Sequence, residues 1–295
     1  MIEILSHDCA EELISKTAAY LEVRESEHNL PLGLMYGLAG NPRRFGVELP
    51  VMLSILDRDR AVGMAIMTQG RKLILSRFDV RTEDAVSPLV RHLHANEVSV
   101  PGVVGPEEEA RVFCDSWVEA VHGASSRLTM RMRAFEIREV AVVPLSKGVM
   151  RLASMDDHPL MAQWIEEFSE QIGEPTDPDA AAGGAERFIQ ARQVYIWDRG
   201  GPVSMAKTSR ATRNGITING VYTPAAHRNK GYATSCVWSL TNKLLSDRYS
   251  FCSLYTDQLN PTSNSIYTKI GYRPVGDALT YDFTYSGSGD SDEAA

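Results

Sequence analysis

The clearest periodic patterns in the chain lie next to each other between residues 216 and 245. Every second residue at the start of this stretch belongs to one face of a predicted β-strand, formed by Ile216, Ile218, Gly220 and Tyr222. Pro224 has no N–H to donate to a neighbouring strand, so it ends the alternation. Apolar residues then recur at the spacing of a helix, at Ala233, Val237, Leu240 and Leu244. The stretch therefore predicts a strand, a tight loop and a helix.

The same two periods predict the order of elements in the rest of the chain. In the first half, helical spacing appears at residues 8–28, 83–94 and 106–121. Strand patterns appear at 51–57, 61–69, 72–78, 98–104 and from 128 towards 143. In the second half, strands are predicted at 149–152, 194–198, 202–208 and 251–257, and helices from 156, at 185–192 and after Asn260. Residues 29–46 and 173–184 are rich in Gly, Pro or small and acidic residues and predict loops.

Length, composition and charge narrow the classes of protein to consider. The chain has 295 residues, which suggests two domains, and 43% hydrophobic residues, which is enough for a core in each. The net charge is −8 and no basic cluster appears, so we expect neither a nucleic-acid partner nor a membrane surface. An acidic protein suits a cationic partner such as an amine. No apolar run has the length of a membrane span and the first residues lack a signal peptide, so we expect a cytoplasmic protein.

The spacing of cysteine and histidine does not indicate a metal site. The four cysteines form no C-x-x-C pair, and the seven histidines are scattered. We therefore predict no metal cofactor and interpret the cysteines as reduced thiols.

The loop between the predicted strand and helix contains residues suited to hold a pyrophosphate. A helix that begins near Gly231 leaves its first N–H groups without partners, at the positive end of the helix dipole. Gly231 and Ala233 are small enough for phosphate oxygens to approach the backbone, and Arg228 and Lys230 add positive charge. The loop has neither the G-x-x-x-x-G-K-[ST] nor the G-x-G-x-x-G pattern. The alternative interpretation is a surface turn with a solvated Arg and Lys.

A second motif follows the predicted strand at 251–257. Asn260 is a suitable helix N-cap with Pro261 at the first helical position, and Gly271 is suited to end a short helix. Tyr267 lies within this predicted helix, seven residues after Asn260. The alternative interpretation of Tyr267 is a half-buried tyrosine with a structural role.

The two motifs together resemble the acetyl-CoA-binding region of the GNAT N-acetyltransferases, over about residues 149–285. The matching features are Val-Tyr-Thr-Pro followed by Arg-x-x-Gly-x-Ala, and then the Asn, Tyr and Gly-aromatic positions of the second motif. The resemblance implies that the strand contacts the pantetheine arm of acetyl-CoA, through Val221, Tyr222 and Thr223. It also implies that the loop wraps the pyrophosphate, with Arg228, Asn229, Lys230, Gly231, Tyr232, Ala233 and Thr234. Asn260 occupies the family position at the end of the second strand.

By the same resemblance, the activity is transfer of an acetyl group from acetyl-CoA to a primary amine of a small molecule or peptide, by direct attack. The attacking amine must lose a proton, and the oxyanion that forms needs a donor, for which a backbone N–H near Val221 or Tyr222 is suited. Tyr267 occupies the position of the usual general acid, which protonates the leaving CoA thiolate.

The general base is left open by the sequence. Many relatives carry a Glu on the strand before the short helix, where this chain has Tyr255. The candidates for the base are Asp257, Glu166, Glu167 and Glu170. Glu170 and Glu174 are alternatively residues that bind a cationic substrate.

The first half of the chain shows a weaker form of the same organisation. Its predicted element order is similar to that of the GNAT family, and residues 59–65 repeat much of 198–206, but it lacks Arg-x-x-Gly-x-Ala. We therefore expect an α/β fold of the α+β type with tandem GNAT-like domains, each a mixed, mostly antiparallel twisted sheet flanked by helices. The expected parts are a degenerate domain at 1–143, a catalytic domain that binds acetyl-CoA at 149–285, and a disordered tail at 286–295.

Two other functions are weighed against an N-acetyltransferase. A non-catalytic acyl-CoA-binding or regulatory protein is favoured by the missing Glu and opposed by the presence of both Asn260 and Tyr267. A nucleotide-phosphate binder is disfavoured because no metal-binding Ser, Thr or Asp lies beside the loop. The sequence does not predict the acceptor amine or the oligomeric state.

Overall fold

The structure is a computed structural model that describes residues 1–286, and it divides into two compact units. Among the described residues, the first unit contains Met1–Ala134, Thr256–Leu259 and residues 274–286, and the second contains Phe135–Tyr255 and Asn260–Arg273. Residues 274–285, expected in the C-terminal domain, therefore group with the first unit. The tail predicted for 286–295 lies, from residue 287 on, outside the described residues.

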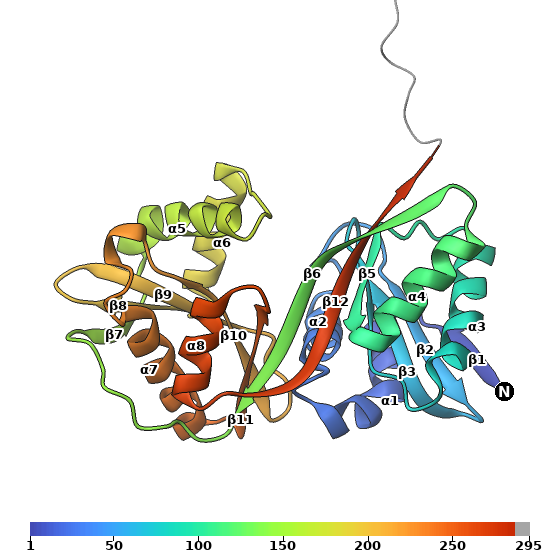
Figure 1. The fold of residues 1–295 in the computed structure, drawn as a ribbon, viewed down its shortest axis with the longest axis horizontal. Helices are drawn as coiled ribbons and strands as arrows, with labels where there is room; N and C mark the ends of the chain where they lie inside the picture. Colours follow the sequence, from blue (N-terminus) through green and yellow to red (C-terminus); the bar gives the residue numbers. More distant parts are fainter. Residues whose placement is uncertain (287–295) are drawn as a thin grey trace, which may run out of the picture. The chain divides into compact units, whose positions relative to one another are not determined.

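The first unit is built on a mixed sheet (Figure 1). Its strands follow the order β1-β2-β3-β4-β5-β12-β6. The pair β4–β5 is parallel. The pairs β1–β2, β2–β3, β3–β4 and β5–β12 are antiparallel. The strands are β1 (Ile2–Ser6), β2 (Val51–Asp57), β3 (Arg60–Met67), β4 (Leu73–Leu75), β5 (Gly102–Pro106), β6 (Ala124–Ile137) and β12 (Arg273–Tyr285).

Two pairs of helices cover the two faces of this sheet, because its central strands are apolar on both sides. The helices are α1 (Ala10–Leu21), α2 (Asn29–Gly40), α3 (Thr82–Ala95) and α4 (Glu107–Ala120). Met35 of α2 and Ile66 of β3 belong to one buried cluster, with α1. Phe113 of α4 and Ala65 of β3 belong to the other, with α3. The alternation of neighbouring residues along β3 thus places the two helix pairs on opposite faces.

The predicted loop at 29–46 is wrong, because Asn29–Gly40 forms helix α2. Pro31 lies in the first turn, where a missing N–H costs no helical hydrogen bond. Leu32, Met35 and Leu38 are buried on one side of the helix. Tertiary burial of this face outweighs the low helix propensity of the Gly and Pro residues.

The second unit contains the strands β7–β11 in the order β11-β10-β9-β8-β7. The pair β10–β11 is parallel, and β9–β10, β8–β9 and β7–β8 are antiparallel. Its strands are β7 (Val149–Leu152), β8 (Val194–Asp198), β9 (Pro202–Ser209), β10 (Gly215–Tyr222) and β11 (Phe251–Asp257). Its helices are α5 (His158–Gln171), α6 (Pro178–Gln190), α7 (Tyr232–Asp247) and α8 (Pro261–Ile270).

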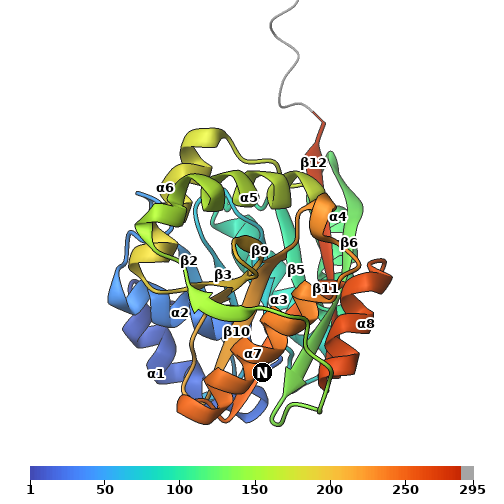
Figure 2. The same ribbon diagram turned by 90° about the vertical axis from the view of Figure 1, so that its left-hand side faces the viewer.

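Helices α5 and α6 pack side by side, apart from α7 and α8 (Figure 2). Trp164 of α5 and Ile189 of α6 form a buried cluster with Met205 of β9. Leu240 of α7 and Ile270 of α8 belong to a second cluster, with strand residues of the opposite parity such as Ala206. The sheet of this unit therefore has an α5/α6 face and an α7/α8 face.

Helix α6 begins earlier than the sequence predicts. The segment 173–184 was expected to be a loop, but its second half already belongs to α6. Asp177 caps the helix by accepting a hydrogen bond from the Ala180 N–H at 2.9 Å, and Pro178 is the first helical residue. Two small residues of this segment, Ala181 and Gly184, are buried, and α6 packs against α5.

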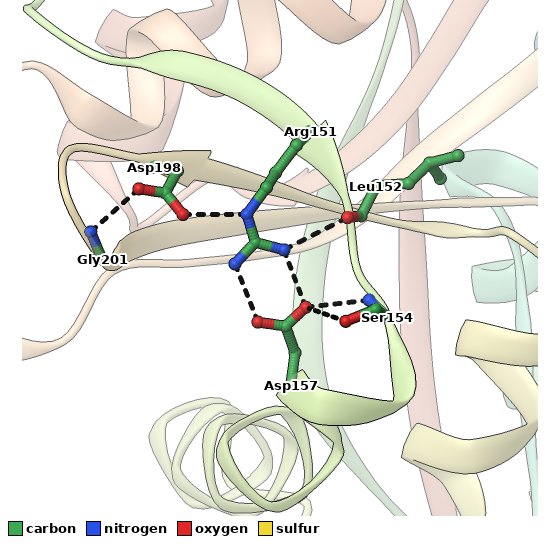
Figure 3. A network of polar contacts seen from close by, with 6 residues as sticks. All are labelled: Arg151, Leu152, Ser154, Asp157, Asp198 and Gly201. Atoms are coloured by element: carbon green, nitrogen blue, oxygen red, sulfur yellow. Dashed lines mark hydrogen bonds and ion pairs between the residues drawn. The ribbon is translucent and has the colours of Figure 1, made fainter.

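A network of polar contacts around Arg151 fixes the start of α5 to the β8–β9 turn (Figure 3). The Arg151 guanidinium donates two hydrogen bonds to Asp157, at 2.7 and 2.8 Å, and one to Asp198 at 2.8 Å. Asp157 also accepts from the Ser154 N–H, and Asp198 from the Gly201 N–H. The Arg151 side chain lowers the pKa of both carboxyl groups, so both are ionised at neutral pH.

Within residues 1–286, no helix combines the length and the apolar character needed to cross a bilayer. The same residues contain no group of three His, Cys, Asp or Glu side chains placed to hold a metal ion. The cysteines are free thiols, and burial raises the pKa of Cys236 and of Cys252 to about 12. These two thiols are therefore protonated and unreactive at neutral pH.

Candidate functional site

The parallel strands β10 and β11 stay paired over only part of their length. Their register covers three residue pairs, from Gly215 to Thr217 on β10. Strand β10 continues to Tyr222 and β11 to Asp257. Beyond the last pair, each strand has backbone groups that the other does not use. An extended ligand can use such groups by hydrogen bonding to a strand.

A β-bulge interrupts β10 beyond the paired segment. The register with β9 shifts between Asn219 and Tyr222, so that Gly220 and Val221 together oppose the single residue Ala206. Gly220 has a φ of +53°, in the region that glycine adopts without strain. A bulge re-aims the backbone and the side chains that follow it.

The bulge makes the predicted alternation wrong beyond Ile218. Ile216 and Ile218 share one face, as predicted, and pack in the cluster of the α7/α8 face, but Tyr222 packs in the cluster of the α5/α6 face. An extra residue in the strand moves the side chains after it to the other face. A glycine inside a strand pattern is the sequence signal for such a bulge.

The loop before α7 presents a row of free backbone donors. Gly231 stands at the N-cap of α7 with a φ of +76°, and Asn229 has a φ of +60°. The backbone N–H groups from Asn229 to Thr234 have no acceptor among residues 1–286, and the next, that of Ser235, bonds to the Gly231 carbonyl. These donors lie at the positive end of a 16-residue helix. Their arrangement is suited to bind a phosphate group.

The two basic side chains of the loop fold back against it. Arg228 donates through Nε to the Thr223 carbonyl and through Nη2 to Gln171 Oε1, each at 3.0 Å. Lys230 Nζ donates to the Ala226 carbonyl at 2.8 Å. Both side chains are exposed to solvent, so their charges remain available to an anion at the loop.

Ser146 holds the loop from a distant part of the sequence. Its Oγ donates to the Lys230 carbonyl at 2.6 Å, and its N–H donates to Ser235 Oγ at 2.8 Å. A Cβ atom on Gly231 would lie 2.8 Å from Ser146 Oγ. The backbone conformation and the space at this position therefore both require glycine. Local sequence patterns do not indicate this role of Ser146, because the contact joins residues more than 80 positions apart.

Tyr222 and Tyr232, both predicted to contact the ligand, are buried. The Tyr222 hydroxyl donates to Glu167 Oε2 at 2.6 Å, and its ring packs against Trp164. The Tyr232 hydroxyl accepts from Arg199 Nη1 at 3.0 Å. Their side chains thus support the site from inside, and only their backbone groups face the strand gap and the loop. Val221, Thr223, Ala233 and Thr234 are half-buried in the same region.

Helix α8 carries the second predicted motif. Asn260 caps it by accepting a hydrogen bond from the Ser263 N–H at 3.0 Å, and Gly271 ends it with a φ of +111°. Tyr267 is 7% exposed and packs between Phe135 and Tyr272. Burial raises the pKa of Tyr267 to about 12, so its hydroxyl is protonated at neutral pH.

The predicted acidic candidates fall in three places. Glu167 lies on α5 and binds Tyr222 of β10, as described above, and its neighbour Glu166 is half-buried. Glu170 and Glu174 are exposed at the end of α5 and beyond it. Asp257, at the end of β11, belongs to the first unit, and its carboxylate accepts a hydrogen bond from the Leu259 N–H.

Comparisons with known proteins find chains of similar fold. Residues 198–280 match the family described as FR47-like protein. The chain is similar to an acetyltransferase from the GNAT family of Colwellia psychrerythraea, with 12% identity, a TM-score of 0.61, and coverage of 96% of this chain and 100% of that chain. It is similar to a tandem GNAT protein from the clavulanic acid biosynthesis pathway, with 11% identity, a TM-score of 0.58, and coverage of 98% and 100%.

A further similarity is to a GCN5-related N-acetyltransferase from Sphaerobacter thermophilus, with 13% identity, a TM-score of 0.61, and coverage of 96% of this chain and 95% of that chain. No curated protein matches the chain. The chain has a tandem GNAT-like fold. The predicted fold class, tandem GNAT-like domains of the α+β type, is confirmed, and identities this low establish the fold alone.

The first GNAT-like unit has a strand, loop and helix in the corresponding place, but its loop differs in its hydrogen bonds and in its charge. Strand β4 runs parallel to β5 and is followed by α3, as β10 runs parallel to β11 and is followed by α7. In the connecting segment, the Phe78 N–H donates to Glu109 Oε1 at 2.9 Å, and the Asp79 N–H donates to the Val62 carbonyl at 2.8 Å. Phe78 itself is buried. The backbone donors of Phe78 and Asp79 are thus used within the unit. Those from Val80 to Glu83 have no acceptor among residues 1–286, but the first turn of α3 carries two carboxylates, Glu83 and Asp84, which oppose the binding of an anion there.

Proposed function

We propose that this protein is an acetyl-CoA-dependent N-acetyltransferase that acetylates a primary amine of a small molecule or peptide by direct attack. The observation that carries the proposal is the row of free N–H groups from Asn229 to Thr234, directly after a strand that is bulged and separated from its parallel neighbour. The loop fits the pyrophosphate of CoA, and the strand fits its extended pantetheine arm. A cytoplasmic location, and partners that are neither nucleic acid nor membrane, stay predictions from the composition.

The proposed binding uses backbone groups more than side chains. The amides of the loop, with Arg228 and Lys230 beside them, would hold the pyrophosphate, and the Val221 to Thr223 segment would pair with the pantetheine arm. When bound, the co-substrate supplies an activated acetyl thioester. A backbone N–H at the bulge near Val221 is suited to stabilise the oxyanion that develops on the acetyl carbonyl.

Tyr267 is the proposed general acid. Its hydroxyl keeps its proton at neutral pH, as an acid must, and burial raises its pKa further, to about 12. The proton would go to the sulfur of the leaving thiolate. Asn260 would fix α8, and with it Tyr267, through the N-cap hydrogen bond to Ser263.

Glu167 is the proposed base for the amine, chosen among the candidates because its carboxylate contacts β10 directly. The Tyr222 hydroxyl donates to Glu167 Oε2, and Gln163 Nε2 donates to Glu167 Oε1 at 2.8 Å. A carboxylate held in this way can attract a cationic amine and accept its proton, directly or through water. The exposed Glu170 and Glu174 would add negative charge around the approach of the amine.

The test is isothermal titration with acetyl-CoA, followed by measurement of thiol release with a panel of amines. Binding and amine-dependent thiol release are the expected results. Binding without release from any amine would contradict the transferase and support a non-catalytic acyl-CoA-binding protein. If acetyl-CoA does not bind, the loop before α7 does not have the proposed role.

A further inference from the structure

One pair of facing residues on the α5/α6 face of the second unit is polar, although it is surrounded by apolar side chains. Lys207 of β9 is the Cα partner of Asn219 of β10, next to the bulge. Facing residues of an antiparallel pair project from the same side of the sheet. Lys207 is half-buried, and its Nζ lies 4.1 Å from the centre of the Phe188 ring of α6. Its side chain also lies against Gly220, where an added Cβ would come within 2.3 Å of Cε.

The charge of Lys207 has no counter-charge in the protein. In the part of the chain that the structure describes, no carboxylate oxygen lies within 4.0 Å of its Nζ. Burial lowers the pKa of Lys207 from 10.5 to about 8, so at neutral pH the ammonium form still predominates. A cation–π contact with Phe188 compensates only part of the lost hydration. A half-buried ammonium group of this kind is best stabilised by the negative charge of a bound ligand.

Asn219 adds an unmatched acceptor on the same side of the sheet. Its Nδ2 donates to Ser209 Oγ at 3.0 Å, but its buried Oδ1 has no donor among residues 1–286. Buried side-chain acceptors without a partner are uncommon in folded proteins. The pair therefore leaves one positive charge and one acceptor to be satisfied by something other than the protein.

The first unit shows that the fold does not need polar residues at this pair. The repeat between 59–65 and 198–206 aligns Ala65 with Ala206, and the next residues are Ile66 and Lys207. Ile66 pairs with Ile74 of β4, just as Lys207 pairs with Asn219 of β10. Both isoleucines are buried, 0% and 8% exposed, in an apolar cluster. The polar pair is thus specific to the second unit, which carries the loop before α7.

We propose that Lys207 binds a carboxylate of the acceptor, so that the substrate carries both a primary amine and a carboxylate, as amino acids do. This inference rests on the proposed acetyl transfer and names its substrate class. Two positions before Lys207, Met205 pairs with Tyr222, whose hydroxyl binds Glu167. Lys207 and Glu167 therefore lie on the same face of the sheet, since Lys207 is two residues along β9 from Met205, the partner of Tyr222. A zwitterionic amine matches this distribution of charge.

The kinetic test compares amino acids with their carboxamides as acceptors, using glycine, alanine, glutamate and lysine. In the wild type we expect kcat/KM for the acids to exceed that for the amides by about 10- to 100-fold, the worth of a charge-assisted hydrogen bond. In Lys207→Met this ratio should fall close to one, through an increase in KM for the acids. Met is expected to fold at this position, because the corresponding residue of the first unit is Ile66. Lys207→Arg should restore part of the ratio.

A binding test separates this inference from the proposed function. Titration with the N-acetylated forms of the same amino acids and amides requires no catalysis, and tighter binding of the carboxylates by the wild type alone would support the role of Lys207. The control is Lys243→Met, which removes an exposed lysine of α7 paired with Asp247 and should change neither test. Carboxylates that bind wild type and Lys207→Met equally would overturn the inference. So would an equal loss of kcat/KM for acids and amides, since Lys207 would then act on the reaction itself.

Discussion

At the scale of single residues, the loop before α7 depends on one backbone position. Gly231 combines a positive φ with a close approach to Ser146, so a larger residue would be strained and would also push Ser146 away. The N–H groups around Gly231 are the ones without acceptors. Their geometry should therefore be lost when the glycine is replaced.

We expect Gly231→Val to raise the Kd for acetyl-CoA by at least about 10-fold, since strain at such a position costs on the order of 1–3 kcal/mol. Isothermal titration gives the Kd directly. Gly200→Val is the matched control, because Gly200 has the same φ of +76° but nothing within 4 Å of an added Cβ. Unchanged affinity in Gly231→Val would mean that the phosphate binds elsewhere.

Tyr267→Phe should lower kcat by about 100-fold, because it removes the proposed proton donor, and should leave the Kd for acetyl-CoA within about twofold. A thiol-release assay measures kcat, and isothermal titration measures the Kd for acetyl-CoA. Tyr272→Phe serves as the control, since it removes another buried phenol hydroxyl, bonded to Thr241 at 2.9 Å, from the same cluster. Equal rates in wild type and Tyr267→Phe would exclude the proposed acid.

The sequence could predict the residues of this site that lie in consecutive stretches, but not those that meet across the fold. Strand, loop and helix around Gly231 follow from local rules of periodicity and capping. Lys207 and Ser146 have ordinary local surroundings in the sequence, and their roles come from pairing and contacts between distant segments. The pairing of Glu167 with Tyr222 depends on the bulge, which reverses the side on which Tyr222 lies.

At the scale of elements, prediction succeeded where amphipathic patterns were strong and failed where burial overrode local preference. Helix α7 and strands β8 to β11 lie close to their predicted positions. Helix α2 was not predicted, because its Gly and Pro residues are typical of a loop. In the structure its apolar face is buried, from Leu32 through Met35 to Leu38. Strand β1 was missed because five residues carry too little pattern.

The Arg151 network links two elements of the second unit, and its loss should destabilise the fold in a pH-dependent way. Arg151→Met leaves the buried Asp157 carboxylate without its partner, which should lower the free energy of unfolding by about 2 kcal/mol at pH 7. The folded-state pKa of Asp157 is lowered below that of the unfolded chain, so this contribution is present above about pH 4. It is lost as the pH falls through the folded-state pKa.

Urea unfolding of wild type and Arg151→Met at pH 7 and at pH 3 measures this difference, which should shrink at the lower pH. Lys243→Met is again the control, because its exposed pair with Asp247 should contribute well under about 1 kcal/mol. A difference that stays constant with pH would show that Arg151 stabilises the unit by packing alone.

At the scale of the whole molecule, the two units have similar folds but differ at the loop before the helix and at one pair of facing strand residues. The loop before α3 uses the N–H groups of Phe78 and Asp79 internally, and the first turn of α3 carries the acidic Glu83 and Asp84. The first turn of α7 has no acidic residue, so its N–H groups are open to an anion. The first unit also has an apolar pair where the second has Lys207 and Asn219. The repeat thus preserved the fold in both units and the features of the site in one.

We therefore expect one molecule of acetyl-CoA to bind per chain. Titration of the full chain should give a stoichiometry of one, and Gly231→Val should remove that binding without revealing another site. A stoichiometry of two, or a full site that survives in Gly231→Val, would show that the first unit also binds the co-substrate.

The place of β12 in the first unit affects how the protein is made. This strand pairs with β5 from Ala278 to Asp282, and Phe283 packs against Phe113 and Trp117 of α4. A ribosome delivers the chain from its N-terminus, so the whole second unit is synthesised before β12 appears. Until then β5 has an unpaired edge and the aromatic cluster of α4 is incomplete. The synthesis of the first unit therefore begins before that of the second unit and ends after it. If synthesis stalls before β12, the edge of β5 stays unpaired and can pair with a strand of another chain.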